Sequence, residues 1–454
     1  MDEKVDIIII GGGPAGIVSA VNCKKYYPTK KVVLIRKNAE VLVPCGIPYI
    51  FGIMLESVED DLVPSQMLQK IGIEVVIDEV LSIQKNDHRV ITEKKHYNFD
   101  KLILATGSVP NVPKNIQNHD ADGVYYVPKD NVYLNNLYTK LSSAKKIVVV
   151  GTGFIGVEIA GELSNNAKQV TLIGSSGLLK HAFDVELSHM MEEQIVNDNL
   201  DLIKHTRVLK INTDDKNRAT GVLLDNDECL ECDAIIFAIG YSSNAELAKN
   251  AGLKMSKFGA VYVDEYMRTD TKDIFAVGDC AEKRHFITRT PINVMLASTA
   301  TAEARIAVGS LYGINYIKGF QGTINIFSTV IENVCYASAG LTERDAKKQD
   351  FDVACATFEA KDKHPAKLPN AHKQAVKLVA MRRNGVVIGA QVVGGIDSGE
   401  MINMLSVIIE NKMDIYALLN LQVATHPLLT ASPTSYPIVK AAELIDIAIN
   451  SCEV

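Results

Sequence analysis

Two strand-to-helix turns with the same glycine spacing constrain this chain more than any other feature. The first, residues 11–16 (GGGPAG), follows the apolar run 5–10, and the second, residues 151–156 (GTGFIG), follows the apolar run 146–150. In a G-x-G-x-x-G pattern the first glycine permits a tight turn, the second lets a pyrophosphate approach the backbone, and the third lets helix and strand pack closely. The chain is therefore predicted to hold two dinucleotide-binding β-α-β units.

The remaining pattern predicts how the chain continues around these units. Helices are expected at 14–26 and 154–165, and each is followed by a further strand, at 31–35 and 169–173. Buried strands that end in small residues are expected at 102–108 and 233–240, and a third strand, 273–279, ends in Gly278 and Asp279. From about residue 320 the pattern changes to strands at 374–381 and 386–393 with helices at 398–410 and 438–450, which is typical of an α+β domain.

Length and charge limit the classes of protein that fit. At about 100–200 residues per domain, 454 residues predict about three domains. A net charge of −7 provides no general cationic field for nucleic acid or an anionic membrane. The most apolar stretch, 293–311, carries Glu303 and Arg305 and is predicted to be a buried Ala-rich helix. No signal segment or membrane span is recognised, so a cytoplasmic location is expected.

One of the eight scattered cysteines has an unusual setting. Cys45 lies between Pro44 and Gly46, and Pro48 follows at a position that a first helical turn tolerates. Cys45 is therefore expected at a helix N-terminus, where the helix dipole would stabilise the thiolate. The alternative is a buried structural cysteine.

The two glycine patterns, the strand end at 105–107 and residues 277–279 follow an order and spacing that resemble the two-dinucleotide-binding flavoprotein disulfide reductases over essentially the whole chain. The resemblance implies a glutathione-reductase-like α/β fold with two Rossmann-like domains and a C-terminal α+β dimerisation domain. It places an FAD-binding domain at 1–113 and 246–324, an NAD(P)-binding domain at 114–245 and the dimerisation domain at 325–454. A homodimer with FAD and NADH or NADPH as cofactors is implied.

The same resemblance implies which residues hold the cofactors. Val80 would lie near the adenine, Asp279 would bind the ribityl and pyrophosphate region, 297–299 would lie near the isoalloxazine, and Glu158 would lie near the nicotinamide. The implied cofactor residues are Gly11, Gly13, Pro14, Ala15, Gly16, Arg36, Val80, Ala105, Thr106, Gly107, Gly151, Gly153, Phe154, Ile155, Gly156, Glu158, Gly240, Gly278, Asp279, Ala297 and Thr299.

Within the family, the dithiol members carry a second cysteine five positions after the first, and this chain has Ile50 there. The single Cys45 resembles the subgroup of coenzyme A-disulfide reductases, persulfide or sulfur reductases, NADH oxidases and NADH peroxidases. It implies an FAD- and NAD(P)H-dependent enzyme that reduces a small disulfide, persulfide, polysulfide or coenzyme A-type substrate through Cys45. The alternatives are an oxidase or peroxidase working through a cysteine sulfenic acid, and a non-catalytic redox-sensing flavoprotein. The oxidase and peroxidase branch carries a histidine where this chain has Pro14.

Two residues near the C-terminus are candidates for acid–base chemistry at Cys45. His426, followed by Pro427, matches the His-Pro with which dithiol relatives reach the partner subunit's active site. Single-cysteine relatives often use a tyrosine instead, and Tyr436 lies on the same stretch. A structural role is the alternative for His426.

Three positions depart from the family pattern. Arg36 stands where the FAD-binding unit usually ends a strand in a ribose-binding carboxylate, so its guanidinium would hold the adenosine end at a phosphate or at the adenine face. Gly174 stands at the corresponding position of the second unit, so NADH and NADPH remain alternatives, with Lys180 or His181 as partners for a 2′-phosphate. Coenzyme A-using relatives carry an arginine on the first helix, where this chain has Asn22, Lys24 and Lys25. Cys229 and Cys232 form a C-x-x-C with no second ligand pair, so no metal site is predicted.

Overall fold

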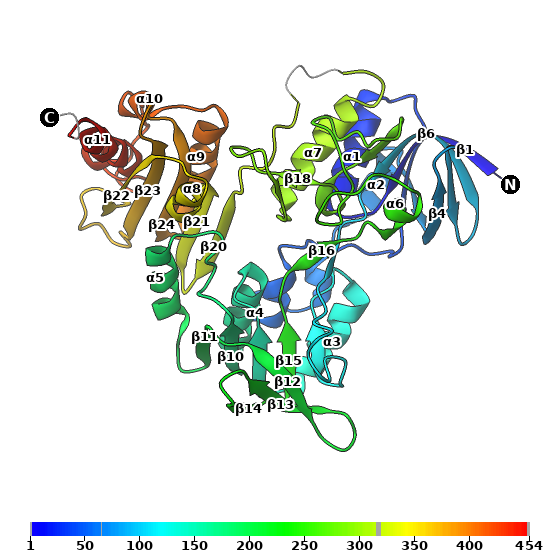
Figure 1. Ribbon diagram of the computed structural model, residues 1–454, viewed down its shortest axis with the longest axis horizontal. Coiled ribbons are helices and arrows are strands. Elements are labelled where there is room, and N and C mark those ends of the chain that lie inside the picture. The colour runs from blue at the N-terminus through cyan, green and yellow to red at the C-terminus, as the bar shows by residue number, and fades with distance from the viewer. Residues whose placement is uncertain (1, 65, 315–318, 452–454) are drawn as a thin grey trace. The chain divides into compact units, whose positions relative to one another are not determined.

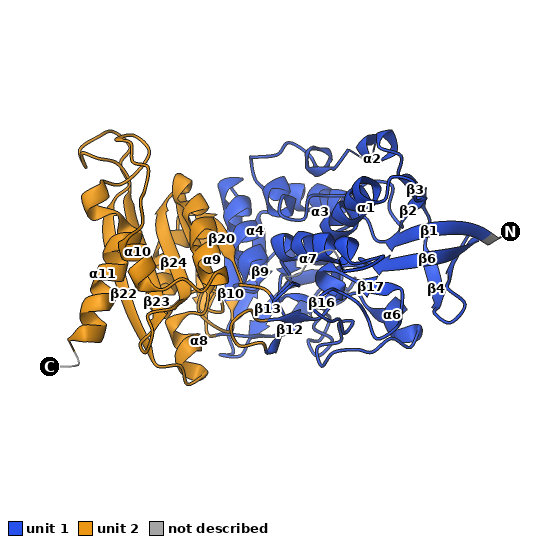
Figure 2. Cartoon of the chain, turned by 90° about the horizontal axis from the view of Figure 1, so that it is seen from above, with its two compact units in different colours: residues 1–173, 206–284, 290–322 blue, residues 174–205, 285–289, 323–454 orange. Residues whose placement is uncertain are grey.

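The computed structural model describes residues 2–64, 66–314 and 319–451. The chain divides into two compact units (Figure 2). The first unit comprises Met1–Ile173, Thr206–Arg284 and Thr290–Gly322, and the second comprises Gly174–His205, His285–Arg289 and Thr323–Val454.

The first unit contains a seven-stranded sheet with the order β3-β2-β1-β6-β5-β4, in which β17 also pairs with β6. The parallel strands are β1 (Asp2–Ile10), β2 (Val32–Arg36), β3 (Glu74–Ile77), β6 (His96–Leu104) and β17 (Ile274–Ala276). β4 (Val80–Gln84) and β5 (Arg89–Thr92) add an antiparallel hairpin. The apolar run of β1 is buried on both faces, as a central parallel strand requires.

Helices complete this part of the first unit (Figure 1). α1 (Pro14–Tyr26) follows β1 directly and packs against α7 (Ala297–Gly309), and both bury small side chains in the core of the large sheet. The predicted Ala-rich helix at 293–311 is therefore confirmed as α7. Short elements lie between β2 and β3, namely η1 (Ile47–Phe51), η2 (Val58–Asp61) and α2 (Gln66–Lys70).

The second glycine pattern lies in a smaller parallel sheet whose order includes β10-β9-β15-β8. These strands are β10 (Gln169–Gly174), β9 (Lys146–Val150), β15 (Ala234–Phe237) and β8 (Val124–Tyr126). α4 (Phe154–Asn165) follows β9, and α3 (Asn131–Ser143) precedes it. The first compact unit also holds a three-stranded antiparallel sheet of β12 (Val208–Thr213), β13 (Ala219–Leu224) and β14 (Cys229–Glu231). Two strand pairs are β7 (Ser108–Pro110) with β16 (Tyr241–Ser243) and β18 (Lys283–Arg284) with β19 (Pro291–Ile292). The remaining elements are α6 (Glu246–Asn250) and η3 (Gly278–Cys280).

The second unit is built on a five-stranded antiparallel sheet with the order β20-β21-β24-β23-β22. Its strands are β20 (Phe327–Ile331), β21 (Val334–Gly340), β22 (Val353–Lys361), β23 (Lys373–Met381) and β24 (Val387–Gly395). α11 (Pro437–Asn450) packs on β22 and β23, and α9 (Met401–Glu410) packs on β21 and β24. The unit also holds α5 (Val185–Ile195), β11 (Leu200–Lys204), α8 (Glu343–Lys348), η4 (Ile396–Glu400), α10 (Ile415–Leu419) and η5 (Pro433–Ser435).

The predicted fold class is confirmed: two β-α-β units carry the glycine patterns, and the C-terminal part is α+β. β9, α1 and α4 have the predicted bounds, and β2 and β10 each end one residue later than predicted. Across the described ranges, no helix has both the length and the apolar character that a bilayer crossing requires.

Candidate functional site

The first glycine turn is shaped by close backbone contacts. Gly11 has φ +115°, and a Cβ atom placed on it would lie 2.1 Å from the carbonyl oxygen of Ala105, at the end of β6. A Cβ on Gly16 would lie 1.9 Å from the oxygen of Gly11. A Cβ on Gly13, the N-cap of α1, would meet none of the described atoms within 4 Å. Backbone atoms therefore fill the space beside Gly11 and Gly16, whereas the space beside Gly13 at the helix N-terminus is open, as a site for a pyrophosphate requires.

The second glycine turn has the same geometry. Gly151 has φ +123°, and a Cβ on it would lie 2.3 Å from the oxygen of Ala238, whereas a Cβ on Gly156 would lie 1.9 Å from the oxygen of Gly151. Around Gly153, the N-cap of α4, the described residues again leave the Cβ position open. Phe154, Ile155 and the half-buried Glu158 follow on the first turns of α4. The two β-α-β units, both in the first compact unit, therefore present a cradle of the same kind.

The open space at Gly153 leads to a testable prediction. Replacing Gly153 with alanine adds a methyl group that meets no protein atom but occupies space that a nicotinamide dinucleotide needs. We expect the KM for NADH or NADPH to rise about tenfold or more, with flavin content and melting temperature unchanged. Gly161→Ala is the matched control, because Gly161 lies in the same helix and its Cβ position is also open. Equal KM values for the two variants would contradict the assignment.

Asp279 directly follows Gly278, which packs against the first glycine turn. Its carboxylate binds the Lys129 ammonium at 2.8 Å and accepts a hydrogen bond from the Ser108 hydroxyl at 2.8 Å. Gly278 has φ +73°, and its Cβ position would lie 2.9 Å from the Cβ of Ala15. Although burial favours the neutral acid, Lys129 and Ser108 hold the pKa of Asp279 below its usual range. Asp279 is therefore an ionised acceptor beside the first glycine turn.

The other predicted cofactor contacts belong to the same unit. Arg36 ends β2 and is buried; it donates from Nη2 to the oxygen of Ala39 at 2.6 Å, and its Cδ lies 2.7 Å from the Cβ position of Gly12. The arginine at the position of the usual carboxylate thus packs against the glycine turn. The remaining predicted contacts are Thr106 and Gly107 after β6, Val80 at the start of β4, Gly240 before β16, and Ala297 and Thr299 in the first turn of α7.

These observations test whether the residues fit the two cofactors. The first cradle offers open backbone N–H groups at a helix N-terminus and a carboxylate acceptor, which suit the pyrophosphate and hydroxyl groups of FAD. The second offers the same helix N-terminus, and β10 ends in Gly174 without a carboxylate. Both dinucleotides fit, and the second cradle does not select between NADH and NADPH.

Cys45 is exposed, but its local structure differs from the prediction. It lies in a turn closed by the Gly46 N–H donating to the oxygen of Val43, and the helix that follows, η1, is a single 3-10 turn with Gly46 as its N-cap. Partial burial of the thiol and the nearby Glu158 raise the pKa of Cys45, and only Lys129 acts in the opposite direction. Cys45 therefore lies directly before the N-cap of a helix, as predicted, but the helix is a short 3-10 segment, and the burial and nearby acids act against the expected thiolate.

A buried carboxyl group that no sequence pattern marks lies beside this turn. Asp61, the last residue of η2, is 4% exposed, and in the described part of the chain its Oδ2 has no hydrogen-bond partner. Its Oδ1 lies 1.8 Å from the position of a Cβ on Gly46. Burial raises the pKa of Asp61 to about 6.

The raised pKa of Asp61 predicts a pH-dependent cost in stability. The folded protein binds this proton more tightly than the unfolded chain, whose aspartate pKa is about 4, so the free energy of unfolding falls as pH rises from about 4 to about 6 and beyond. Asp61→Asn removes this fall. We measure the free energy of unfolding of both proteins by urea denaturation. We expect the value for Asp61→Asn minus the value for wild type to increase by about 1–1.5 kcal/mol between about pH 5 and pH 7.5. A pH-independent difference would contradict this.

Among the described residues, no other cysteine has a comparable setting. Cys23 and Cys280 are buried in the core of the first unit, as predicted for Cys23. Cys229 is exposed on β14, whereas Cys232, after the strand, is buried. The C-x-x-C therefore points its two side chains into different environments.

His426 and Tyr436 belong to the second unit. His426 is exposed and accepts at Nδ1 from the N–H of Leu428 at 3.2 Å. Tyr436 is the N-cap of α11 and is 8% exposed, and burial raises its pKa. Their predicted role toward Cys45 stays a prediction.

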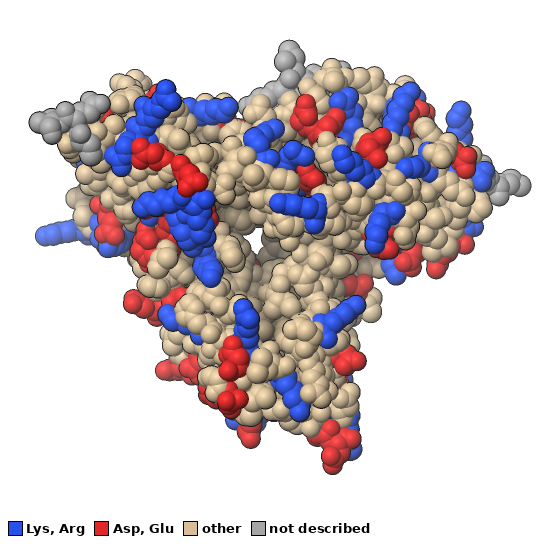
Figure 3. All heavy atoms as spheres, in the orientation of Figure 1, with Lys and Arg blue, Asp and Glu red and all other residues tan. Residues whose placement is uncertain are grey.

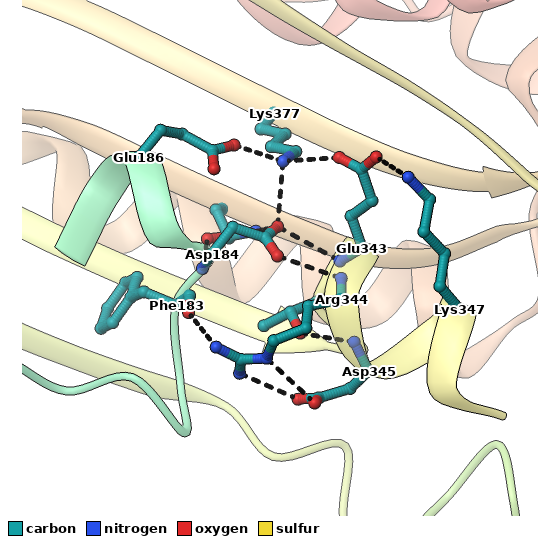
Figure 4. Close-up of polar contacts among 10 residues, drawn as sticks. Phe183, Asp184, Glu186, Glu343, Arg344, Asp345, Lys347 and Lys377 are labelled. Carbon is teal, nitrogen blue, oxygen red and sulfur yellow. Dashed lines mark hydrogen bonds and ion pairs between the residues drawn. The ribbon is translucent and has the colours of Figure 1, made fainter. Parts of the chain in front are cut away.

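The second unit also holds a cluster of three carboxylates, Asp184, Glu186 and Glu343, whose oxygens lie within 4.8 Å of one another. The buried Lys377 ammonium lies among them, 3.0 Å from Asp184 and 2.9 Å from Glu343, and it also binds Glu186 (Figure 4). The position that a metal ion would take is thus filled by an ammonium group, and the cluster joins α5, α8 and β23 within the unit.

Acidic and basic side chains alternate over the face drawn in Figure 3.

Comparison with known proteins places the chain in a family. Residues 5–304 match pyridine nucleotide-disulphide oxidoreductases, and residues 326–435 match the dimerisation domain of those proteins. The NAD(P)H sulfur oxidoreductase (CoA-dependent) of Pyrococcus furiosus is 32% identical over 400 residues, which cover 86% of this chain and 88% of that protein. The NADH oxidase of Enterococcus faecalis is 27% identical over 90% of this chain and 92% of its own length.

Among solved structures, the NAD-dependent persulfide reductase from A. fulgidus superposes with a TM-score of 0.90 and 27% identity, covering 98% of this chain and 84% of that one. The predicted resemblance to flavoprotein disulfide reductases is confirmed, and the C-terminal part is a dimerisation domain. The chain belongs to the pyridine nucleotide-disulphide oxidoreductase family and is an oxidoreductase that uses FAD and NADH or NADPH.

Proposed function

We propose that this protein uses NAD(P)H to reduce a small disulfide, persulfide or polysulfide, with Cys45 as its single redox thiol. The observation that carries the proposal is the position of Cys45. It is an exposed thiol in the unit that holds both dinucleotide cradles, and the position five residues later is the buried Ile50. Because this position cannot provide a second thiol, the substrate must supply the partner sulfur. The sulfur oxidoreductase and persulfide reductase relatives support the substrate class.

The chemistry at Cys45 follows from thiol–disulfide exchange. The Cys45 thiolate attacks one sulfur of the substrate, the S–S bond breaks, and the other sulfur leaves as a thiolate that takes up a proton. Cys45 is then joined to half of the substrate. Bound FAD supplies electron transfer from NAD(P)H to sulfur. Two electrons and a proton release the second half of the substrate and restore Cys45. One turnover therefore consumes one NAD(P)H and yields two thiols from a disulfide, a thiol and hydrogen sulfide from a persulfide, or hydrogen sulfide and a shortened chain from a polysulfide.

The site residues and the domain boundaries form part of the same proposal. We assign FAD to residues 1–113 and 246–324, NAD(P)H to residues 114–245, and a homodimer interface to residues 325–454. The open cradles at Gly13 and Gly153 and the ionised Asp279 support the cofactor sites. His426 or Tyr436 would protonate the departing thiolate across the dimer.

A second candidate function is the reduction of oxygen or peroxide through a sulfenic acid at Cys45. The NADH oxidase relatives favour it. Against it stands Pro14 at the position where the oxidase and peroxidase branch carries a histidine, since a proton donor is then missing at that point of the first glycine turn.

The proposal is tested by an acceptor screen. The FAD-loaded enzyme is supplied anaerobically with NADH or NADPH and with coenzyme A disulfide, glutathione disulfide, polysulfide or peroxide, and oxygen is tested separately. We expect nucleotide oxidation to depend on a sulfur acceptor and to yield, per nucleotide, two thiols from a disulfide or one hydrogen sulfide from polysulfide. Oxidation that requires oxygen or peroxide and is unaffected by every sulfur acceptor would replace the proposal with the second candidate.

A further inference from the structure

Asp61 is a buried ionisable group beside the Cys45 turn that the proposed chemistry does not use. The chain segments 41–43 and 61–63 run side by side, since the Val43 N–H donates to the oxygen of Asp61 at 2.9 Å and the Val63 N–H donates to the oxygen of Val41 at 2.7 Å. Val43 is also the acceptor that closes the turn around Cys45. The backbone of Asp61 thus holds the segment that leads into Cys45.

The side chain of Asp61 contacts the other end of the same turn. Its Oδ1 lies so close to the Cα of Gly46 that a Cβ there would be 1.8 Å from it, and Oδ2 is buried without a hydrogen-bond partner among the described residues. A carboxylate in such a place loses its hydration without compensation. Nothing in the packing of η2 requires an acid at this position, because its neighbours Glu59 and Asp60 are solvent-exposed.

The end of η1 has a similar arrangement. Glu162 of α4 is 8% exposed, and its Oε2 is buried without a hydrogen-bond partner in the described chain. This Oε2 lies 1.8 Å from the position of a Cβ on Gly52, the C-cap of η1. Burial raises the pKa of Glu162 above its usual range. Buried carboxyl groups therefore contact the glycines at both ends of the short helix that follows Cys45, and Asp61 is the one next to the cysteine.

We propose that Asp61 is a positioning residue for Cys45, whose buried carboxyl group packs on Gly46 when protonated and opposes formation of the Cys45 thiolate when ionised. The inference rests on the proposed role of Cys45 as the redox thiol. It makes the reactivity of Cys45 depend on the protonation of a second group that has no contact with substrate.

The charges around Cys45 determine the sign of this effect. Glu158 on α4, Asp61 on η2 and Asp279 on η3 disfavour the thiolate, Lys129 favours it, and Tyr49 on η1 lies near Glu158, Glu162 and Cys45. Of the three acids, Asp279 is ionised by its bonds to Lys129 and Ser108, whereas Asp61 has a pKa of about 6. Asp61 is therefore an acid near Cys45 whose charge changes between about pH 5 and pH 7.

The test measures the alkylation of Cys45 directly. The FAD-loaded wild type, Asp61→Asn and Glu59→Gln are treated with iodoacetamide without nicotinamide, and the modified Cys45 peptide is quantified by mass spectrometry across the pH range. Glu59→Gln is the matched control, because it removes one exposed carboxylate from the same short helix. We expect Asp61→Asn to react about twofold to fourfold faster than wild type above about pH 7, with the ratio falling to one below about pH 5. Glu59→Gln should stay near wild type throughout.

A rate ratio for Asp61→Asn that is constant with pH would overturn the inference, because a purely structural change would alter Cys45 equally at all pH values. Where Asp61→Asn fails to fold, Asp61→Ser removes the same charge with a smaller side chain and is held to the same expectation. The measurement needs no turnover. If Cys45→Ser retained full activity, the proposed function would fail; if Cys45→Ser were inactive and the ratio did not change with pH, only the role of Asp61 would fail.

Discussion

Replacing Cys45 with serine is expected to lower turnover with every sulfur acceptor by about a thousandfold or more. A serine hydroxyl is not ionised at neutral pH and cannot form the S–S bond that the exchange requires, so the nucleophile is removed while the size of the side chain is kept. Because serine keeps the size of the side chain, the two cradles should be unaffected. We therefore expect rapid anaerobic bleaching of the flavin by NADH or NADPH in Cys45→Ser, as in wild type.

The control for this variant is Cys229→Ser, which changes the other fully exposed cysteine of the described chain. It should turn over sulfur acceptors at the wild-type rate. Full activity in Cys45→Ser, or an equal loss in both variants, would show that electrons reach the acceptor without Cys45.

The second large effect is expected at the buried ion pair of Lys283 and Glu303. The Lys283 ammonium binds Glu303 at 2.9 Å and also donates to the carbonyl oxygens of Gly278 and Ala281, and the Gly278 N–H donates to Glu303 at 2.8 Å. The two side chains are 4% and 0% exposed. Lys283→Met leaves a buried carboxylate without its cation, which costs about 3–5 kcal/mol. The turn that carries Asp279 should loosen as well, so we expect a lower urea midpoint and a lower flavin content.

A double variant separates the charge from the packing. In Lys283→Met/Glu303→Gln the uncompensated carboxylate is absent, and most of the lost stability should return. The double-mutant cycle should therefore show an interaction energy of about 2 kcal/mol or more. Additive losses would mean that the two residues stabilise the fold independently.

The parts of the fold that the sequence predicted are those governed by local pattern. The glycine turns could be recognised because the backbone approaches at Gly11 and Gly151 exclude any side chain, and such exclusion fixes both residue type and spacing. The apolar strands beside them are buried on both faces, so they appear as continuous runs such as 146–150.

The missing parts depend on contacts between residues far apart in the chain. Lys129 meets Asp279 across 150 positions, and neither its spacing nor its neighbours mark it. Asp61 reads as one of three exposed acids in a row until the pairing of 41–43 with 61–63 buries it. The error at Cys45 has a similar cause: the prolines were consistent with a helix start, but the length of η1 and the acids around the thiol are set by tertiary packing.

The central claim is that Cys45 accepts half of the substrate, and trapping that adduct tests it most directly. Enzyme with a free Cys45 thiol and oxidised FAD, without nicotinamide, is mixed anaerobically and in parallel with coenzyme A disulfide, glutathione disulfide and polysulfide. The masses of the intact protein and of its peptides are then measured by mass spectrometry. We predict one adduct per chain on Cys45 with the acceptor that supports turnover, and its loss after NADH or NADPH is added. An acceptor that is turned over without any adduct on Cys45, or an adduct that NAD(P)H does not release, would contradict the account.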